Sequence, residues 1–203
     1  EAARVAAEKA AKAKAAKDAA NVQKAIDKAL AKDRAARAAA ARRQQQQQRS
    51  CFVGETPITM ADGTKKNIID VRVGDRVMGG TSENFNTVMG IEEVALEERM
   101  LYSLNGSGIQ GQRETGWITD EHPLWTTDGW KALNKEATYL YHGLEEGVVT
   151  DLKFGDIILT EDGPVKFTSF ETFGAAEDSS VFNLLLDGNN EYIANGFIVH
   201  NRS

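Results

Sequence analysis

The sequence contains few residues of several types, and each shortage excludes a class of protein. Its 203 residues include one cysteine, so no disulfide can form within the chain. One cysteine and three histidines also argue against a Cys/His zinc site of the usual spacing. No apolar run approaches the roughly 20 residues that span a bilayer, and the start of the chain lacks the apolar region of a secretory signal. We therefore expect no membrane span, no metal and no cofactor.

The amino-acid composition changes abruptly at Cys51, which divides the chain into two parts. The first 50 residues contain no glycine, no proline and no aromatic residue, and 20 of them are alanine. They carry 13 basic and five acidic residues, whereas residues 51–203 carry 11 basic and 25 acidic residues. The acidic second part argues against a nucleic-acid interface there. The length of the chain is compatible with one or two domains.

Residues 1–43 are predicted to form a long Ala-rich α-helix, because they favour helix and contain no helix breaker. A short apolar stripe over residues 22–30 could pair weakly with another helix. The glutamine run at 44–48 is interpreted as a linker or a fraying helix end. The numbering opens at Glu1 without methionine, so we expect residues 1–50 to be a spacer from a larger host protein, without chemistry of its own.

From residue 51 onward, short β-prone runs alternate with turn signals such as Asp-Gly and Asn-Gly. This pattern predicts an all-β fold, with only weak helical candidates at 92–100 and 130–141. Residues 70–78 (DVRVGDRVM) match residues 151–159 (DLKFGDIIL) in residue type at every position but one. Chance similarity between two turns is the alternative, but the extent of the match favours a duplicated half-domain.

The two boundaries of this body carry residues with chemical potential. Cys51 is the only sulfur nucleophile, although a lone cysteine is most often a small buried hydrophobe. At the other boundary, Asn201 is either a turn residue or a reactive one, since an asparagine amide nitrogen can attack its own backbone carbonyl. His200 beside it could then shuttle the proton. In the middle, His122 is either a catalytic or a buried packing histidine.

Three motifs together resemble the Hedgehog/intein (Hint) superfamily. Residues 51–58 (CFVGETPI) resemble its first motif, residues 119–122 (TDEH) its internal T-x-x-H motif, and residues 181–201 its terminal motif ending in His-Asn. Their order and spacing agree over residues 51–201. The resemblance implies an all-β Hint horseshoe with pseudo-two-fold, short twisted strands, most like a minimal intein or an A-type bacterial intein-like domain. The helical segment 1–50 would precede it, and residues 202–203 would follow it.

The resemblance implies a reaction at the start of the body. Cys51 would attack the carbonyl of Ser50 and convert the Ser50–Cys51 peptide bond into a thioester, which is nucleophilic catalysis on the protein's own backbone. Thr119 would hydrogen-bond near the scissile amide, and His122 would protonate the departing nitrogen.

A second reaction is implied at the end of the body, where Asn201 would cyclise and break the Asn201–Arg202 bond. His200 would donate the proton to the leaving amine. Splicing inteins usually carry Cys, Ser or Thr directly after the terminal asparagine, whereas Arg202 is not a nucleophile, and Ser203 lies one residue further along. The resemblance therefore implies cleavage at one or both ends, with ligation inefficient or by a non-standard route.

Two further positions depart from the family pattern near the second reaction. Asn183 stands where many inteins have aspartate, and Asn190 stands where many have a histidine that assists cyclisation. Both are auxiliary candidates, and both departures affect the C-terminal step more than the first step.

We therefore predict a single-turnover self-processing domain whose substrate is its own flanking polypeptide, with an external thiol, amine or water as an acyl acceptor. No nucleic acid or membrane partner is expected, the location is cytoplasmic by default, and a bacterial or phage host protein is suspected. The alternative is an inert β-rich structural or interaction module on a helical spacer. A Hedgehog-like domain that passes its thioester to an alcohol or sterol ranks last, because only two residues follow the body.

Overall fold

The computed structural model describes Lys24 and Lys28, and then residues 51–201 except 82, 98, 108–116, 143, 145, 146 and 175–178. The chain divides into two units, Glu1–Gln46 and Gln47–Ser203. In the first unit, Lys24 and Lys28 are helical and exposed. The rest of the helix expected over residues 1–43 lies outside the described residues and stays a prediction.

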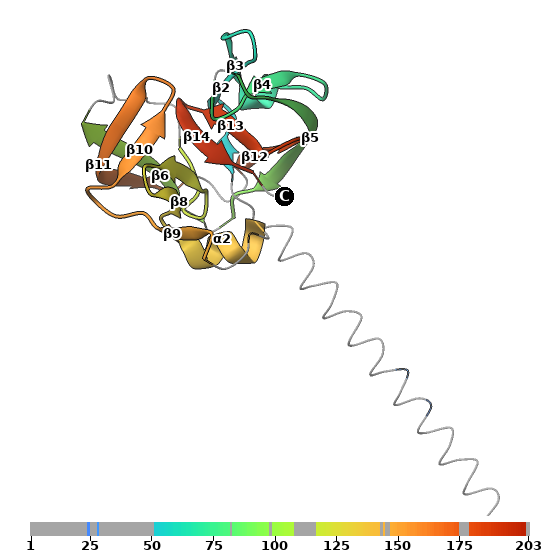
Figure 1. Cartoon of the computed structure of the whole chain (residues 1–203). Coiled ribbons are helices and arrows are strands. Elements are labelled where there is room, and N and C mark those ends of the chain that lie inside the picture. Colours follow the sequence, from blue (N-terminus) through green and yellow to red (C-terminus); the bar gives the residue numbers. More distant parts are fainter. Residues whose placement is uncertain are drawn as a thin grey trace, which may run out of the picture. The chain divides into compact units, whose positions relative to one another are not determined.

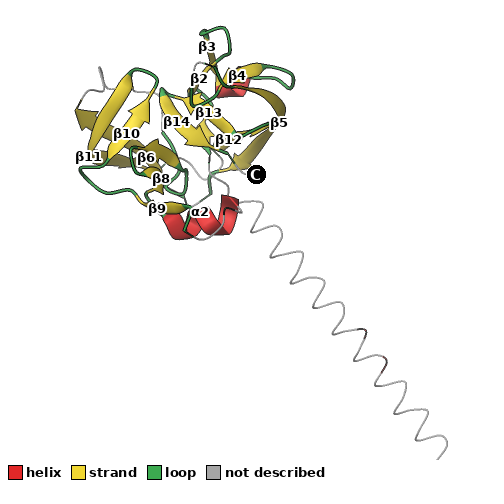
Figure 2. Ribbon diagram, viewed as in Figure 1, coloured by secondary structure: helices red, strands yellow, loops and turns green. Residues whose placement is uncertain are grey.

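From residue 51 onward the fold is mostly β, as the sequence predicts (Figure 2). The described residues there contain one α-helix, α2, which overlaps the weak helical candidate at 130–141, whereas residues 92–95 of the other candidate belong to a strand. The elements run in the order β1 (Phe52–Val53), β2 (Pro57–Thr59), β3 (Lys65–Asn67), the 3-10 helix η1 (Ile68–Asp70), β4 (Arg76–Met78), β5 (Phe85–Ala95), β6 (Leu101–Ser107), β7 (Leu124–Thr126), β8 (Gly129–Ala132), α2 (Lys135–His142), β9 (Val149–Asp151), β10 (Ile157–Thr160), β11 (Gly163–Phe173), β12 (Ser180–Leu186), β13 (Glu191–Ala194) and β14 (Phe197–His200).

The strands form two hydrogen-bonded sheets. The smaller sheet has the order β1-β12-β5-β4, and the larger one has the order β3-β2-β13-β14-β10-β7-β8-β9, with β11 joining β10 to β6. The last two strands, β13 and β14, lie between β2 from the start of the body and β10 from its second half (Figure 1). Because β12 also pairs with β1, this topology places the beginning and the end of the body together.

The sequence repeat corresponds to two turns of the same structure. In the first copy, the Asp75 carboxylate accepts a hydrogen bond from the Arg72 N–H at 2.8 Å. In the second copy, the Asp156 carboxylate accepts one from the Lys153 N–H, also at 2.8 Å. The side-chain carboxylate therefore closes each turn in the same way, as aspartate commonly does in turns.

The backbone and the ion pairs of the two turns agree as well. Gly74 and Gly155 have φ angles of 91° and 100°, a left-handed conformation that glycine adopts without steric cost. Each turn aspartate also contacts a lysine, Lys66 in the first copy at 2.8 Å and Lys131 in the second at 2.9 Å. Agreement at this level favours duplication over chance similarity.

Two clusters of buried apolar residues form the core. The larger one joins residues from both halves of the body and includes the fully buried Phe52, Phe167 and Tyr192. The smaller one consists of Cys51, Leu96, Leu101 and Val181. Burial of this apolar surface stabilises the fold by roughly 25 cal/mol per Å². Cys51 is thus part of the buried core.

Candidate active site

The main chain of Cys51 is held by a single residue from a distant part of the sequence. The Cys51 N–H donates to Thr119 Oγ1 at 2.9 Å, and the Thr119 N–H donates to the Cys51 carbonyl at 3.1 Å. The Thr119 hydroxyl also lies 3.4 Å from that carbonyl oxygen. Both residues are fully buried. Thr119 therefore fixes the amide nitrogen that belongs to the Ser50–Cys51 bond.

His122 lies on the same turn as Thr119 and close to the start of the body. Its N–H donates to the Thr119 carbonyl at 3.3 Å, so the T-x-x-H sequence forms a compact turn. The imidazole is 1% exposed. It packs edge-on against Phe52, with ring centroids 4.3 Å apart, and lies 6.5 Å from the ring of Tyr192. The structure therefore places this histidine against Phe52, the residue that follows Cys51.

The thiol of Cys51 lies in an apolar environment that opposes its ionisation. Burial raises its pKa well above the usual value, and the nearby charge of Arg99 lowers it only in part. Arg99 itself is held in place by main-chain carbonyls, because Nε donates to Leu96 at 3.1 Å and Nη2 donates to Ala95 at 2.9 Å. In this arrangement Cys51 is a neutral thiol at physiological pH.

Glu121 is a second titratable group in the same region. It is 2% exposed, and one of its carboxyl oxygens lies 3.4 Å from Nη1 of Arg99. Burial, together with a hydrogen bond that the protonated carboxyl donates to Asp120, raises its pKa to about 8. Thr138 Oγ1 donates to the Glu121 carbonyl at 2.7 Å and fixes its main chain. Glu121 is therefore mostly protonated at neutral pH and ionises in mild alkali.

Asn201 directly follows β14, and its side chain is hydrogen-bonded to two residues of β12. The residue is fully buried. Its Oδ1 accepts a hydrogen bond from Asn183 Nδ2 at 2.5 Å, and its Nδ2 donates to the Leu184 carbonyl. Its backbone N–H donates to the Asn190 carbonyl at 2.7 Å. Two of the predicted auxiliary residues therefore contact Asn201, Asn183 through its side chain and Asn190 through its main chain.

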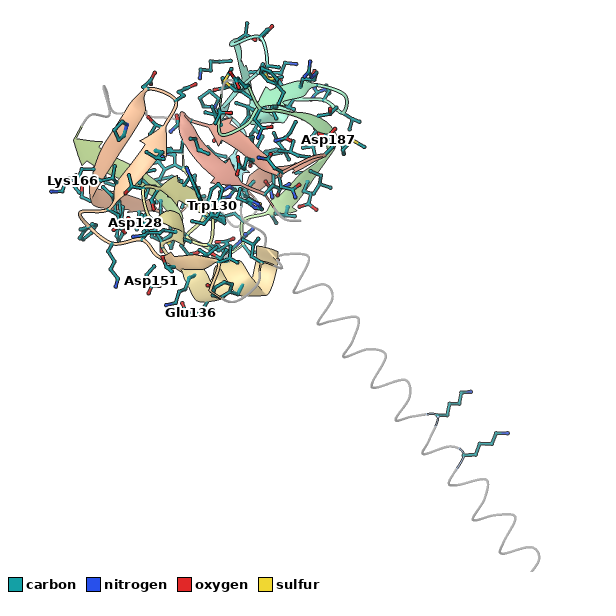
Figure 3. All side chains as sticks on the ribbon, viewed as in Figure 1. Asp128, Trp130, Glu136, Asp151, Lys166 and Asp187 are labelled. Atoms are coloured by element: carbon teal, nitrogen blue, oxygen red, sulfur yellow. The ribbon has the colours of Figure 1, made fainter. Side chains whose placement is uncertain are left out.

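His200, the residue before Asn201, is the last residue of β14 and is partly buried. Its ring packs edge-on against Trp130 of β8, with centroids 5.2 Å apart; the position of Trp130 is marked in Figure 3. Burial lowers the pKa of His200 below its usual value of 6.5. The imidazole is therefore largely neutral at physiological pH.

Three predicted site residues, Ser50, Arg202 and Ser203, lie outside the described residues. Within the described part of the chain, no helix is long and apolar enough to cross a membrane. The same residues contain no group of three or more His, Cys, Asp or Glu side chains that could hold a metal ion.

Sequence reasoning missed three residues in this region, namely Arg99, Glu121 and Tyr192. Glu121 and Tyr192 lie inside two of the motifs, which is the only signal that could have found them. Tyr192 is fully buried, and its hydroxyl donates to Asn183 Oδ1 at 3.0 Å. Arg99 lies between β5 and β6, and nothing in the sequence around it distinguishes it from a surface arginine.

The fold of the body is similar to that of solved inteins. The DnaB intein from Synechocystis sp. PCC 6803 matches over 76% of this chain and 99% of that chain, with a TM-score of 0.56 and 19% sequence identity. The body has an intein-like Hint fold. The fold expected from the three motifs is thereby confirmed.

Two further structures support the same Hint fold. The bacterial intein-like domain from Clostridium thermocellum matches over 74% of this chain and 98% of that chain, with a TM-score of 0.53 and 24% identity. The gp41-1 intein matches over 75% of this chain and 98% of that chain, with a TM-score of 0.50 and 18% identity. No protein-family model and no curated protein matches the chain. At these identities the likeness establishes the fold, while the chemistry has to be argued from the side chains.

Proposed function

We propose that the Hint body cleaves its own flanking peptide bonds, at Ser50–Cys51 and at Asn201–Arg202. The observation that carries this proposal is the 2.9 Å hydrogen bond from the Cys51 N–H to Thr119 Oγ1. The nitrogen of this N–H is the leaving group of the first reaction. A turn that binds this nitrogen and also carries a buried histidine has the parts that amide cleavage requires.

In the first reaction, Cys51 Sγ attacks the Ser50 carbonyl carbon. A carbon–sulfur bond forms, the bond from that carbon to the Cys51 nitrogen breaks, and the nitrogen gains a proton as the thiol loses one. Thr119 accepts the N–H hydrogen bond and thereby raises electron density on the nitrogen, which favours its protonation. His122, on the same turn, delivers the proton. Attack within one chain provides an effective concentration of up to ~10⁵–10⁸ M when the groups are well oriented.

Burial of the Cys51 thiol adds to the activation barrier of this reaction, because the thiol is not ionised beforehand. The raised pKa of Cys51 means that its proton leaves as the sulfur attacks, rather than beforehand. Arg99 is the nearby cation that partly stabilises negative charge on the sulfur. Protonated Glu121 leaves the positive charge of Arg99 available for this purpose.

In the second reaction, Asn201 Nδ2 attacks the Asn201 carbonyl carbon. The new nitrogen–carbon bond closes a succinimide ring, and the bond to the Arg202 nitrogen breaks. Nδ2 releases one proton, and the Arg202 amine gains one. His200, the adjacent residue, carries the proton to the leaving amine. The complete burial of Asn201 excludes the water that would otherwise compete with cyclisation.

Cleavage is the expected outcome of these two reactions. Arg202 carries no oxygen or sulfur that could take over the acyl group, so the branched intermediate of standard splicing does not form at that position. The thioester at Cys51 is instead released to an external thiol, an amine or water. Ligation through Ser203 would need a different geometry and is expected to be inefficient.

Intact mass of the full chain, incubated with and without a small thiol, tests this proposal. A species with the mass of residues 51–203, formed faster with thiol, supports the first reaction. A species with the mass of residues 1–201 less one water supports the second. A single unchanged mass after days in both conditions would favour the inert β-rich module.

A further inference from the structure

A chain of hydrogen bonds ends at the side chain of Asn201. The Tyr192 hydroxyl and the Leu184 N–H each donate to Asn183 Oδ1, at 3.0 Å in both cases. Asn183 Nδ2 then donates to Asn201 Oδ1 at 2.5 Å, and Asn201 Nδ2 donates to the Leu184 carbonyl. All four residues are 0–1% exposed, so water does not compete for these groups.

The main chain of Leu184 fixes the direction of every hydrogen bond in this chain. Its N–H can only donate, so the atom of Asn183 that faces it must be the amide oxygen. The NH₂ group of Asn183 therefore faces Asn201, and the atom of Asn201 that accepts its hydrogen bond must be Oδ1. Nδ2 of Asn201 is then left facing the Leu184 carbonyl, which can only accept. The Leu184 N–H and the Leu184 carbonyl, at the two ends of this series of hydrogen bonds, thus require the same orientation of both amides. Neither amide can be turned over without breaking two hydrogen bonds.

We propose that Asn183 and Tyr192 are positioning residues that hold the Asn201 side-chain amide in the orientation needed for cyclisation. Tyr192 acts one step further from the reaction, because its hydroxyl holds Asn183. This inference rests on the proposed reaction at Asn201, and it assigns to Tyr192 a part in that reaction.

The orientation matters because an amide nitrogen is a poor nucleophile. Its lone pair is delocalised toward oxygen, and it becomes available only as the nitrogen loses a proton and the oxygen takes up negative charge. Donation from Asn183 Nδ2 to Asn201 Oδ1 stabilises the charge where it develops. The Leu184 carbonyl holds one Nδ2 hydrogen, which limits rotation of the amide. The attacking nitrogen is therefore activated and oriented by the same chain of hydrogen bonds.

Aspartate at position 183 would break this chain while preserving its shape. A carboxylate cannot donate, so it would face Asn201 Oδ1 with a lone pair, and the Asn201 amide would have to turn over. The turned amide would then place its oxygen against the Leu184 carbonyl. We expect Asn183→Asp to slow cleavage at Asn201–Arg202 about tenfold, and Tyr192→Phe to slow it about threefold, as for the loss of a buried hydrogen bond.

The test measures loss of Arg202 and Ser203 by intact mass in chains that carry Cys51→Ala, so that only the C-terminal reaction is followed. Tyr139→Phe is the matched control, because its hydroxyl accepts from the Gly147 N–H at 2.9 Å and also donates to the Val149 carbonyl, away from Asn201. We expect this control to cleave at the parent rate. Equal rates in the parent and in Asn183→Asp would overturn the inference.

A second readout separates this inference from the proposed reaction itself. In ¹⁵N NMR spectra, with the Asn201 NH₂ pair assigned from Asn201→Ala, one hydrogen should exchange slowly in the parent and rapidly in Asn183→Asp. If the parent never loses Arg202 and Ser203, the reaction fails but the slow hydrogen still supports the positioning role. Fast exchange of both hydrogens in the parent would overturn it.

Discussion

The regions around Cys51 and Asn201 hold the proposed reacting groups in different ways. At Cys51 the main chain is held by Thr119, while the thiol lies among apolar residues, with Arg99 as the nearby cation that lowers its pKa in part. At Asn201 the side chain itself is held, by neutral groups in a fixed order. For the two proposed reactions, we therefore expect proton transfer to limit the first and orientation of the amide to limit the second.

The largest expected effect separates the two regions completely. Cys51→Ala should abolish thiol-dependent cleavage at Ser50–Cys51 and leave cleavage at Asn201–Arg202 largely intact, because the second nucleophile is untouched. Asn201→Ala should do the reverse. Fragment masses from the two variants provide the measurement. Release of residues 1–50 from Cys51→Ala under thiol would show that no thioester is involved.

His122 tests the idea that proton transfer limits the first reaction. His122→Ala should slow cleavage at Ser50–Cys51 by roughly 10²–10⁴, the usual contribution of a general acid. Cleavage at Asn201–Arg202 should change far less. The time course of each fragment, followed by mass in the same sample, supplies both rates. A parallel loss at both ends would instead indicate a structural role for this buried ring.

Substitution of Thr119 tests the contribution of its hydrogen bond with the Cys51 N–H. Thr119→Val keeps the shape but removes the acceptor of the Cys51 N–H, and it should slow the first reaction by about 10–100-fold. Thr126→Val is the matched control, since Thr126 is equally buried and its hydroxyl donates to the Gly129 carbonyl at 2.7 Å. Similar rates in the two variants, measured by release of residues 1–50, would contradict the role given to Thr119.

The pH dependence of the second reaction sharpens the comparison. Because the pKa of His200 lies below 6.5, the protonated fraction grows as the pH falls toward that pKa. If His200 donates the proton, cleavage at Asn201–Arg202 should rise by up to about tenfold per pH unit over this range. Rates in a Cys51→Ala chain test this, with His200→Ala as the control that loses the rise. A rate that increases with pH would argue against donation by His200.

The last expected effect concerns folding stability near Cys51 and not the rate of either reaction. Glu121 has a pKa of about 8 in the folded state against 4.5 for the free side chain. The unfolded chain therefore releases this proton first, and the free energy of unfolding should fall as the pH rises between these values. Glu121→Gln cannot ionise and should flatten this part of the profile, as measured by urea unfolding. Identical profiles for the two chains would show that Glu121 ionises normally.

Much of the fold and part of the site could be predicted from sequence. The turns at Asp75 and Asp156 were visible because a turn depends on neighbouring residues. Cys51, Thr119 and His122 were found from motif order, and the structure brings all three together. These sequence patterns are short and local, so they can be recognised without knowledge of the topology.

Other contributions could not be predicted, because they depend on contacts between distant strands. Arg99 reaches the thiol only because β1 pairs with β12 and β12 with β5. Asn190 was considered for its side chain, whereas its carbonyl contacts Asn201, from a backbone with a φ of 60°. The role proposed for Tyr192 depends on the hydrogen bond from its hydroxyl to Asn183, nine residues earlier in the sequence.

The central claim is that the Ser50 acyl group moves from nitrogen to the sulfur of Cys51. Incubation of the full chain with hydroxylamine at neutral pH tests it most directly, because hydroxylamine cleaves a thioester but not a peptide bond under mild conditions. The account predicts release of residues 1–50 as a hydroxamate at Ser50, and no release from Cys51→Ala. Absence of the hydroxamate at Ser50, or equal release of residues 1–50 from Cys51→Ala, would contradict it.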